Sequence, residues 1–334
     1  MIPAADRFAG FILGQCLGDA LGFLVEGEPP HVCAQYAEEV IRAGKLPRLT
    51  RGGFAFGQYS DESQMARELM ESFVSCAGFD PEDYARRIVA LFAENRVVGR
   101  GRATEEAVKR LATGVSWRES GTPAPAAGNA SAVRAGVFGL IYGDDPDRLI
   151  RMACDQSVIT HTDQRCSAGA VTIAGAVALA ARDTRPVAED FLTPLRQWAQ
   201  RVEPSLATGL RCLQDILTQP PRQAAEAVSR LGLPPGVDSQ WRGGISAFVV
   251  SSVLWALYAF FKHPDDFTAA VALAIEVGGD VDTTAAMAGG LVGARRGTAA
   301  IPQQLAGCLN DHGGWQRDDL IALADACHKL CRGR

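Results

Sequence analysis

The chain lacks both a long uncharged apolar run and a block of basic residues. No stretch of about 18 such apolar residues stands out as a membrane helix, and residues 245–261, which come closest, contain serines and a tyrosine that suit a core helix better. The formal net charge is −5, with no basic cluster of the kind that attracts nucleic acid. Acidic Asp6 precedes only a short apolar run, FAGFILG, which is unlike a secretory signal. We therefore expect no membrane anchoring and no basic nucleic-acid surface.

The nine cysteines lack regular spacing and do not form the pattern of a disulfide framework. Cys327, His328 and Cys331 lie close together, but the second half of a structural zinc site is missing. This cysteine usage favours reduced thiols and predicts a cytoplasmic protein.

The sequence also lacks alternation of strands and helices, low-complexity segments and repeats. Its hydrophobic content of 47% argues against disorder. In residues 6–25 the apolar side chains return to one helical face, beside Gly14, Gly18 and Gly22, a stripe that suits close helix packing. Similar patterns predict a single all-α domain over residues 1–334, with further helices at 81–95, 104–113, 187–218, 243–261, 264–276 and 316–331.

The stretch GGDVDTTAAMAGGLVGARR, residues 278–296, combines two carboxylates with a small-residue helix. Asp280 and Asp282 point apart on a regular helix, so they converge only in a turn, which the preceding glycine pair permits. Thr283 or Thr284 is the expected N-cap, and Ala286, Gly290 and Gly293 would form a smooth helix face. The carboxylates could complement the helix dipole or bind a hard cation.

A second acidic cluster lies at Ser60, Asp61 and Glu62, within YSDESQMA. Ser60 is expected to cap a helix whose buried face begins at Met65. Capping alone would explain one such cluster. Two clusters, each with a hydroxyl and two carboxylates at the start of a core helix, could together supply the oxygen ligands of one or two magnesium ions.

Four further positions have both an ordinary and a functional interpretation. Glu26 precedes Gly27 and Pro29-Pro30, so it is either a solvated loop acid or a side chain that reaches into a cleft. Gly99 and Gly101 fit an ordinary turn or a phosphate loop without its lysine, and Gly128-Asn129 fits a plain helix start or a phosphate-binding one. His161 fits a cap, a packed core residue or a functional group.

The chain resembles the ADP-ribosylglycohydrolase family, which includes the dinitrogenase reductase-activating glycohydrolases. The resemblance extends over nearly the whole length, through GDALGFLVEG, YSDESQMA, GRGRAT, GNASAVR, THTDQRCSAGA and, most specifically, GGDVDTTAAMAGGLVGA. It implies an all-α fold with a cleft for two Mg²⁺ ions, or Mn²⁺ in their place, that removes ADP-ribose from a modified acceptor.

The resemblance also implies a role for each matching residue. The metal ligands would be Ser60, Asp61, Glu62, Asp280, Asp282 and Thr283. Catalysis would involve Glu26, Asp61 and Asp282. The ADP-ribose would contact Gly99, Gly101, Gly128, Asn129 and His161. The acceptor, which could be a protein arginine or serine, a nucleic-acid base or a small molecule, is left open.

Two positions depart from the family pattern, which commonly has threonine, aspartate and aspartate where this chain has Ser60, Asp61 and Glu62. Serine keeps the hydroxyl ligand. Glutamate adds a methylene group, whereas magnesium requires near-ideal octahedral geometry at about 2.0–2.1 Å. The main hypothesis is therefore a magnesium-dependent ADP-ribosyl hydrolase, and the alternative is an ADP-ribose-binding protein of the same fold with weak or lost hydrolysis.

Overall fold

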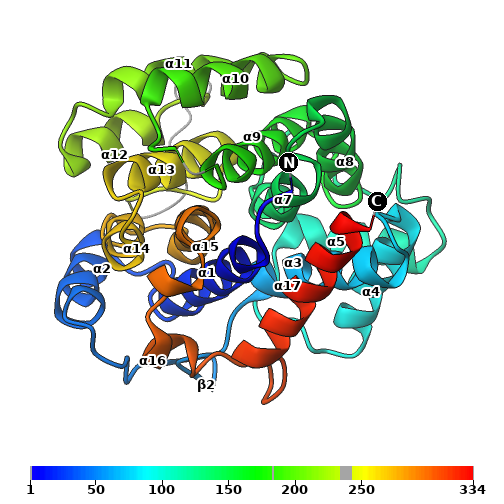
Figure 1. Ribbon diagram of the computed structural model, residues 1–334, viewed down its shortest axis with the longest axis horizontal. Helices are drawn as coiled ribbons and strands as arrows, with labels where there is room; N and C mark the ends of the chain where they lie inside the picture. The colour runs from blue at the N-terminus through cyan, green and yellow to red at the C-terminus, as the bar shows by residue number, and fades with distance from the viewer. Residues whose placement is uncertain (1, 183, 234–242, 334) are drawn as a thin grey trace.

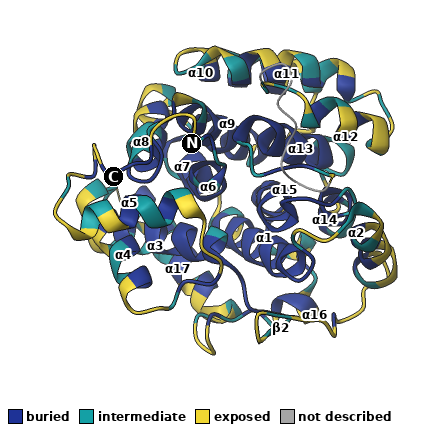
Figure 2. Ribbon diagram, turned by 180° about the vertical axis from the view of Figure 1, so that it is seen from behind, coloured by how far each residue is buried: buried dark blue, intermediate teal, exposed yellow. Residues whose placement is uncertain are grey.

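Two helices rich in small residues lie side by side at the centre of the molecule, α1 (Ala5–Phe23) and α15 (Val281–Arg296) (Figure 1). The structure is a computed structural model that describes residues 2–182, 184–233 and 243–333. Nearly every residue of both helices is buried, and Figure 2 shows them in dark blue inside a ring of partly exposed helices. The two glycine-rich segments of the sequence therefore pack against each other.

The glycines of α1 allow the backbones of α1 and α15 to touch. A Cβ atom added at Gly14 would lie 2.2 Å from the carbonyl oxygen of Gly289, and one at Gly18 would lie 2.2 Å from that of Ala285. The contact face of α15 thus contains Ala285 and Gly289. It also contains the predicted Gly290 and Gly293, where an added Cβ would lie 3.1 Å from the Phe11 ring and 1.9 Å from the Gly10 carbonyl oxygen. At Gly22, an added Cβ would lie 2.5 Å from the Cα atom of Asp282. The helix pair therefore fixes the backbone of a predicted site residue.

We expect Gly18→Ala to lower the free energy of unfolding by about 1–3 kcal/mol, because the added methyl group must push apart two backbones that cannot yield locally. Denaturant titration would measure the loss. Gly333→Ala is the matched control, since Gly333 has φ −84° and an added Cβ would lie 3.7 Å from its nearest neighbour. Equal stabilities of the two variants would contradict the close packing.

The remaining helices surround this pair, and the all-α prediction is confirmed. On the N-terminal side they are α2 (Pro30–Tyr36), the π-helix η1 (Ala37–Arg42), α3 (Asp61–Ser75), α4 (Pro81–Ala93) and α5 (Arg102–Ala112). The middle of the chain forms α6 (Ala130–Val133), η2 (Arg134–Gly136), α7 (Val137–Tyr142), α8 (Pro146–Val158), α9 (Gln164–Ala180), α10 (Ala188–Gln200), α11 (Pro204–Ile216) and α12 (Pro221–Ser229). The last elements are α13 (Val249–Lys262), α14 (Phe267–Ile275), η3 (Thr298–Ala300), α16 (Gln303–Ala306) and α17 (Arg317–Arg332).

Three local features differ from the sequence-based expectation. A short antiparallel hairpin, β1 (Thr50–Arg51) and β2 (Phe54–Ala55), precedes α3. The predicted helix after Asn129 is divided into α6, η2 and α7. The prediction of Thr283 or Thr284 as the N-cap of α15 is wrong, because the helix begins at Val281 with Asp280 in the capping position. The prediction of one domain over residues 1–334 stays a prediction.

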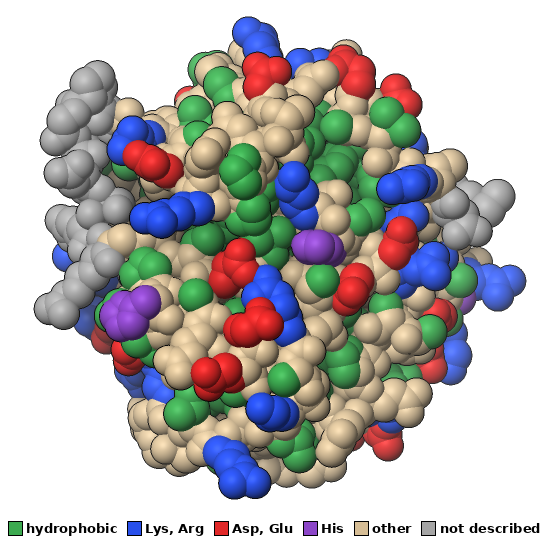
Figure 3. Space-filling view, turned by 90° about the vertical axis from the view of Figure 1, so that its left-hand side faces the viewer, with side chains coloured by type: hydrophobic (Ala, Val, Ile, Leu, Met, Phe, Trp, Pro, Cys, Tyr) green, Lys and Arg blue, Asp and Glu red, His purple; other side chains and the backbone are tan. Residues whose placement is uncertain are grey.

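Helix composition, cysteines and surface charge were each considered in the sequence. Among the described residues, no helix is both long and apolar enough to cross a membrane. None of the nine cysteines, all of which lie in the described ranges, forms a disulfide bond. On the face drawn in Figure 3, acidic and basic side chains are intermixed with apolar ones. That face therefore carries no large field of one sign that would attract a polyanion.

Candidate active site

One cleft of about 440 Å³ contains most of the residues that the sequence singled out. Its lining includes the acids Glu26, Asp61, Glu62, Asp280 and Asp282, and the predicted ligand contacts Gly99, Gly101, Gly128, Asn129 and His161. Ser60 and Thr283 do not line the cleft, but both hydrogen-bond to Glu62. The fold thus brings all the predicted site residues together.

The first acidic cluster joins the loop after α1 to the start of α15. Carboxylate oxygens of Glu26, Asp280 and Asp282 lie within 4.8 Å of one another. Gly278 and Gly279 have φ angles of +76° and +96°, so they form the predicted glycine turn. The Gly27 amide donates to the Gly279 carbonyl over 3.0 Å, which holds the Glu26 loop against this turn. The arrangement is compatible with a shared cation.

The second acidic cluster lies at the start of α3. Ser60 caps the helix as predicted, and its Oγ accepts from the Glu62 amide over 3.3 Å. Glu62 Oε1 accepts from the Thr283 hydroxyl over 3.0 Å, which joins α3 to α15. Glu62 Oε2 is buried and has no hydrogen-bond partner. A buried carboxylate oxygen without a partner is costly unless a donor or a cation satisfies it.

Asp19 hydrogen-bonds to the backbone of the second acidic cluster, a role that we did not predict from the sequence. Its carboxylate accepts from the backbone amide of Ser60, over 3.0 and 3.1 Å, and from that of Ser63 over 3.1 Å. Asp19 is fully buried, and burial raises its pKa to about 6. The signal in the sequence is an acid within an otherwise apolar helix, but its partners lie more than forty residues away along the chain.

The acids of the cleft oppose one another's ionisation. Burial first, and then neighbouring carboxylates, raise the pKa values of Asp61, Glu62 and Asp282 well above their usual range. Burial also raises the pKa of Glu26 to about 7, with Asp280 adding to the shift. Together with the unpartnered Glu62 oxygen, this repulsion shows that the donor set fits a divalent cation, which prefers oxygen ligands.

Arg51 is a further member of the site that we did not predict. Its Nη2 atom lies 2.9 Å from Glu26 Oε2, and its Nη1 donates to the Glu26 carbonyl oxygen. The guanidinium also lies over the Phe23 ring, 5.4 Å from the centroid. Arg51 comes from the β1–β2 hairpin, so this element holds the Glu26 side chain at the edge of the cleft.

The predicted ligand contacts lie beside the acids in the same cleft. A Cβ atom at Gly99, where φ is +78°, would lie 2.7 Å from Asp61 Oδ1, so only glycine fits beside this carboxylate. Asn129 Nδ2 donates to Asp280 Oδ2 over 2.5 Å. The Asn129 side chain therefore positions a predicted metal ligand, and a phosphate contact from Gly128 and Asn129 stays a prediction.

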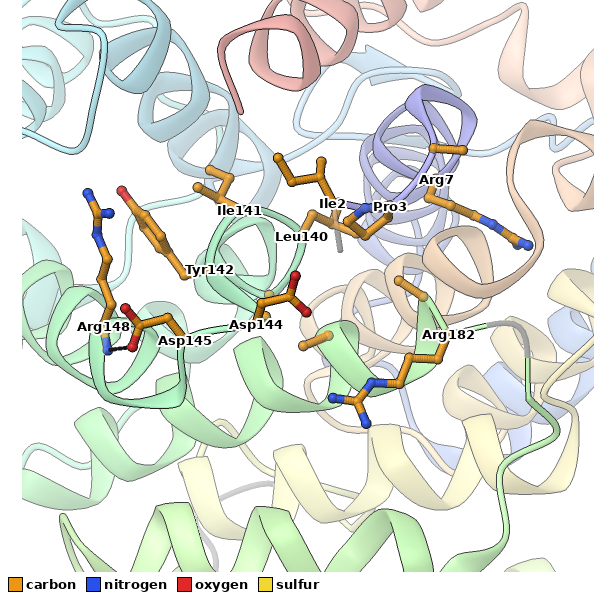
Figure 4. Close-up of a pocket in the computed structure, with 15 residues that line it drawn as sticks. Ile2, Pro3, Arg7, Leu140, Ile141, Tyr142, Asp144, Asp145, Arg148 and Arg182 are labelled. Atoms are coloured by element: carbon orange, nitrogen blue, oxygen red, sulfur yellow. Dashed lines mark hydrogen bonds between the residues drawn. The ribbon is translucent and has the colours of Figure 1, made fainter. Parts of the chain in front are cut away.

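A larger cavity of about 620 Å³ lies elsewhere, between α7, the start of α1 and the end of α9 (Figure 4). It is lined by Ile2, Leu140 and Tyr142 together with arginine and aspartate side chains, and the Asp145 carboxylate there caps α8. None of the residues predicted for catalysis lies in this cavity. We therefore assign the chemistry to the smaller cleft, where the acids converge.

Comparison with known proteins agrees with this geometry. The family model for ADP-ribosylglycohydrolases matches residues 2–334. The chain belongs to the ADP-ribosylglycohydrolase family. This membership confirms the resemblance seen in the sequence and makes the protein an enzyme of the ADP-ribosyl hydrolase type.

Individual relatives of this glycohydrolase cover most of its length. An uncharacterised protein of Archaeoglobus fulgidus is 29% identical, with 97% of each chain covered. The ADP-ribosylhydrolase ARH3 of Xenopus tropicalis is 27% identical over 90% of each chain. The ADP-ribosylarginine hydrolase Tri1 of Pseudomonas putida is 26% identical over 90% of this chain and 73% of its own. A solved structure described as an ADP-ribosylglycohydrolase-related protein complex superposes with a TM-score of 0.74, 27% identity and 98% coverage of both chains.

Proposed function

We propose that this glycohydrolase uses magnesium to hydrolyse the N- or O-glycosidic bond between ADP-ribose and a modified acceptor. The observation that supports this proposal best is the convergence of both acidic clusters in one cleft that also contains Gly99, Gly128 and His161. A glycosidic bond held in this cleft would lie close to the carboxylates. We also propose a cytoplasmic location, which the lack of disulfide bonds among the described cysteines supports.

The predicted metal ligands are Ser60, Asp61, Glu62, Asp280, Asp282 and Thr283. Glu26 is a further candidate, because its carboxylate shares a cluster with Asp280 and Asp282. When bound, Mg²⁺, or Mn²⁺ in its place, would polarise substrate oxygens and lower the pKa of water. Asn129 and Thr283 hold Asp280 and Glu62 through hydrogen bonds, so these two carboxylates are oriented before any ion binds.

Glu26 is the proposed general base. Its carboxylate lies at the edge of the cleft beside Asp280 and Asp282, where it can take a proton from water as the acceptor leaves the anomeric carbon. Arg51 orients the Glu26 carboxylate toward the cleft. Asp61 and Asp282 lie in the same cleft and are the alternative proton acceptors. Gly99, Gly101, Gly128, Asn129 and His161 would bind the ADP-ribose portion.

Release of ADP-ribose is the decisive measurement. We expect the protein to release it from an arginine- or serine-ADP-ribosylated peptide with magnesium, and to lose this activity with a chelator. The name of the Pseudomonas relative supports arginine as the first acceptor to test. Nucleic-acid and small-molecule conjugates would follow. Absence of release from every conjugate, under conditions where free ADP-ribose binds, would contradict hydrolysis.

The alternative function is ADP-ribose binding with weak or lost hydrolysis. The feature that favours it is Glu62 itself, which adds a methylene group where the family commonly has aspartate, whereas magnesium requires near-ideal octahedral geometry. Calorimetry with ADP-ribose would show binding without turnover in this case. Turnover gained by Glu62→Asp, which shortens the side chain by one methylene group, would then identify Glu62 as the cause.

A further inference from the structure

A buried hydrogen-bonded chain leads from Arg134 to His161 at the wall of the cleft. Arg134 Nη2 donates to Thr160 Oγ1 over 2.7 Å, and Thr160 Oγ1 lies 2.9 Å from His161 Nδ1. All three side chains are at most 2% exposed. Arg134 is itself fixed by Gln156, whose side-chain and carbonyl oxygens accept over 2.6 and 3.0 Å. Gln156 of α8 therefore holds these hydrogen-bonded side chains in a single geometry.

The direction of each hydrogen bond follows from the donor groups. A guanidinium has five donors and no acceptor, so Thr160 Oγ1 must accept from Arg134. The threonine oxygen could accept a second hydrogen bond from an Nδ1–H, but the buried threonine hydrogen would then have no acceptor. Among the described residues, His161 Nδ1 is the only acceptor within hydrogen-bond distance of this hydroxyl, so the hydroxyl donates to Nδ1. Nδ1 must then be the unprotonated nitrogen of a neutral imidazole, which leaves the hydrogen on Nε2. The tautomer is thus assigned from the network, without reference to a ligand.

The environment keeps this imidazole neutral. Burial, and then the charge of Arg134, lower the pKa of His161 to about 3, although Asp163 opposes the shift. The backbone around the ring is also held, because Thr122 donates to the Thr160 carbonyl over 2.8 Å and accepts from the Thr162 amide over 3.0 Å. The ring cannot easily turn to exchange its two nitrogens.

The Nε2 atom lies on the cleft side of the ring. A Cβ atom at Gly128 would be 3.2 Å from His161 Nε2, and both residues line the cleft. Because Gly128 lacks a side chain, the N–H group is left accessible beside the start of α6. No hydrogen bond from Nε2 to another described residue is present, so its donor is available to a ligand oxygen.

We propose that Arg134 and Thr160 are positioning residues that fix His161 as the Nε2–H tautomer, a neutral hydrogen-bond donor to an oxygen atom of the bound ADP-ribose. The inference rests on the proposed function for the identity of the ligand. It assigns a role in binding to two buried residues that do not line the cleft.

The test combines the tautomer with ligand affinity. Long-range ¹H–¹⁵N correlation spectra report which ring nitrogen carries hydrogen, and His161→Ala identifies the His161 signals among the five histidines. We expect Nε2–H in the wild type at neutral pH and a mixture of tautomers in Thr160→Val, which removes the hydroxyl donor at nearly equal volume. The dissociation constant for ADP-ribose should rise about 3- to 10-fold in this variant, the loss of one hydrogen bond.

Three controls separate this role from a structural one. Thr172→Val removes another fully buried hydroxyl, which bonds the Ala168 carbonyl within α9, and should change neither tautomer nor affinity. Thr160→Ser keeps the donor and should behave as the wild type. In the His161→Ala background, Thr160→Val should have no further effect on affinity, because it acts only through the imidazole.

Several results would overturn the inference. The inference is wrong if the wild-type His161 ring carries its hydrogen on Nδ1 or is charged at neutral pH. It is also wrong if Thr160→Val leaves the tautomer of His161 unchanged. If Thr160→Val does not fold, the wild-type protein still tests the inference. An Nε2–H signal whose chemical shift does not change on addition of ADP-ribose would exclude the contact. Failure of wild-type protein to bind ADP-ribose would instead refute the proposed function, while the ligand-free spectrum would still test the tautomer.

Discussion

Asp282→Asn is expected to reduce the rate of ADP-ribose release by about 100-fold or more, the effect of removing one group from a preorganised catalytic site. Asp282 is one of three carboxylates whose oxygens lie within 4.8 Å, and it is placed by contact between α15 and Gly22. Asparagine has the same shape and keeps the oxygen that accepts from the Thr283 amide over 2.8 Å. The variant removes the charge and preserves the local hydrogen bond.

The same substitution should leave the metal-free protein at least as stable as the wild type. Burial raises the pKa of Asp282 well above its usual range, with Glu26, Asp280 and other acids contributing, so ionisation of this carboxylate is unfavourable in the folded state. A neutral amide avoids this repulsion. Loss of activity with preserved stability is typical of a residue kept for function.

Thermal unfolding in chelator and ADP-ribose release in magnesium would be measured side by side. Asp266→Asn is the matched control, because Asp266 is an exposed cap of α14 outside the cleft and asparagine also caps well. It should leave activity unchanged. Retention of more than about a tenth of the activity in Asp282→Asn would contradict the proposed role.

Asp311→Ala is expected to lower the free energy of unfolding by about 3–5 kcal/mol, because it leaves a buried charge undercompensated. Asp311 Oδ2 accepts from Arg67 Nη1 over 2.6 Å, and the Arg67 side chain is fully buried. Asp311 Oδ1 accepts from the side-chain amides of Gln58 and Gln64 over 2.9 and 2.7 Å. A single carboxylate thus satisfies three buried donors.

Loss of Asp311 should also loosen the cleft wall. Gln64 Oε1 accepts from the Val98 amide over 2.9 Å, and the Val98 carbonyl accepts from the Asp61 amide over 2.6 Å. Denaturant titration would measure the stability change, with Asp318→Ala as control. Asp318 pairs with Arg317 at the surface, where such pairs contribute little. A loss in Asp311→Ala no larger than in the control would show that Glu68 alone compensates Arg67.

Much of the fold could be predicted from the sequence because the patterns that mark its helices are local. The 3.6-residue periodicity predicts α1, α4 and α17 to within a few residues, and the Ser60 cap marks the start of α3. The hairpin that carries Arg51 was missed, because two-residue strands leave almost no periodic pattern. The predicted start of α15 was wrong because Thr283, Thr284 and Asp280 are all suitable N-caps. In the structure Asp280 takes this position, and its backbone amide donates to the carbonyl of the distant Ile245 over 2.7 Å.

The sequence by itself determined which residue types are available for the chemistry and that small residues line two helices. Glycine spacing and acid clusters are readable along the chain because each depends on near neighbours. Only the tertiary structure decided which partners each acid has: Asp19 with the α3 amides, Arg51 with Glu26, and Thr283 with Glu62. These pairings join segments up to 221 residues apart. They depend on how α1, α3, α15 and the hairpin pack together in the folded protein, which no local pattern specifies.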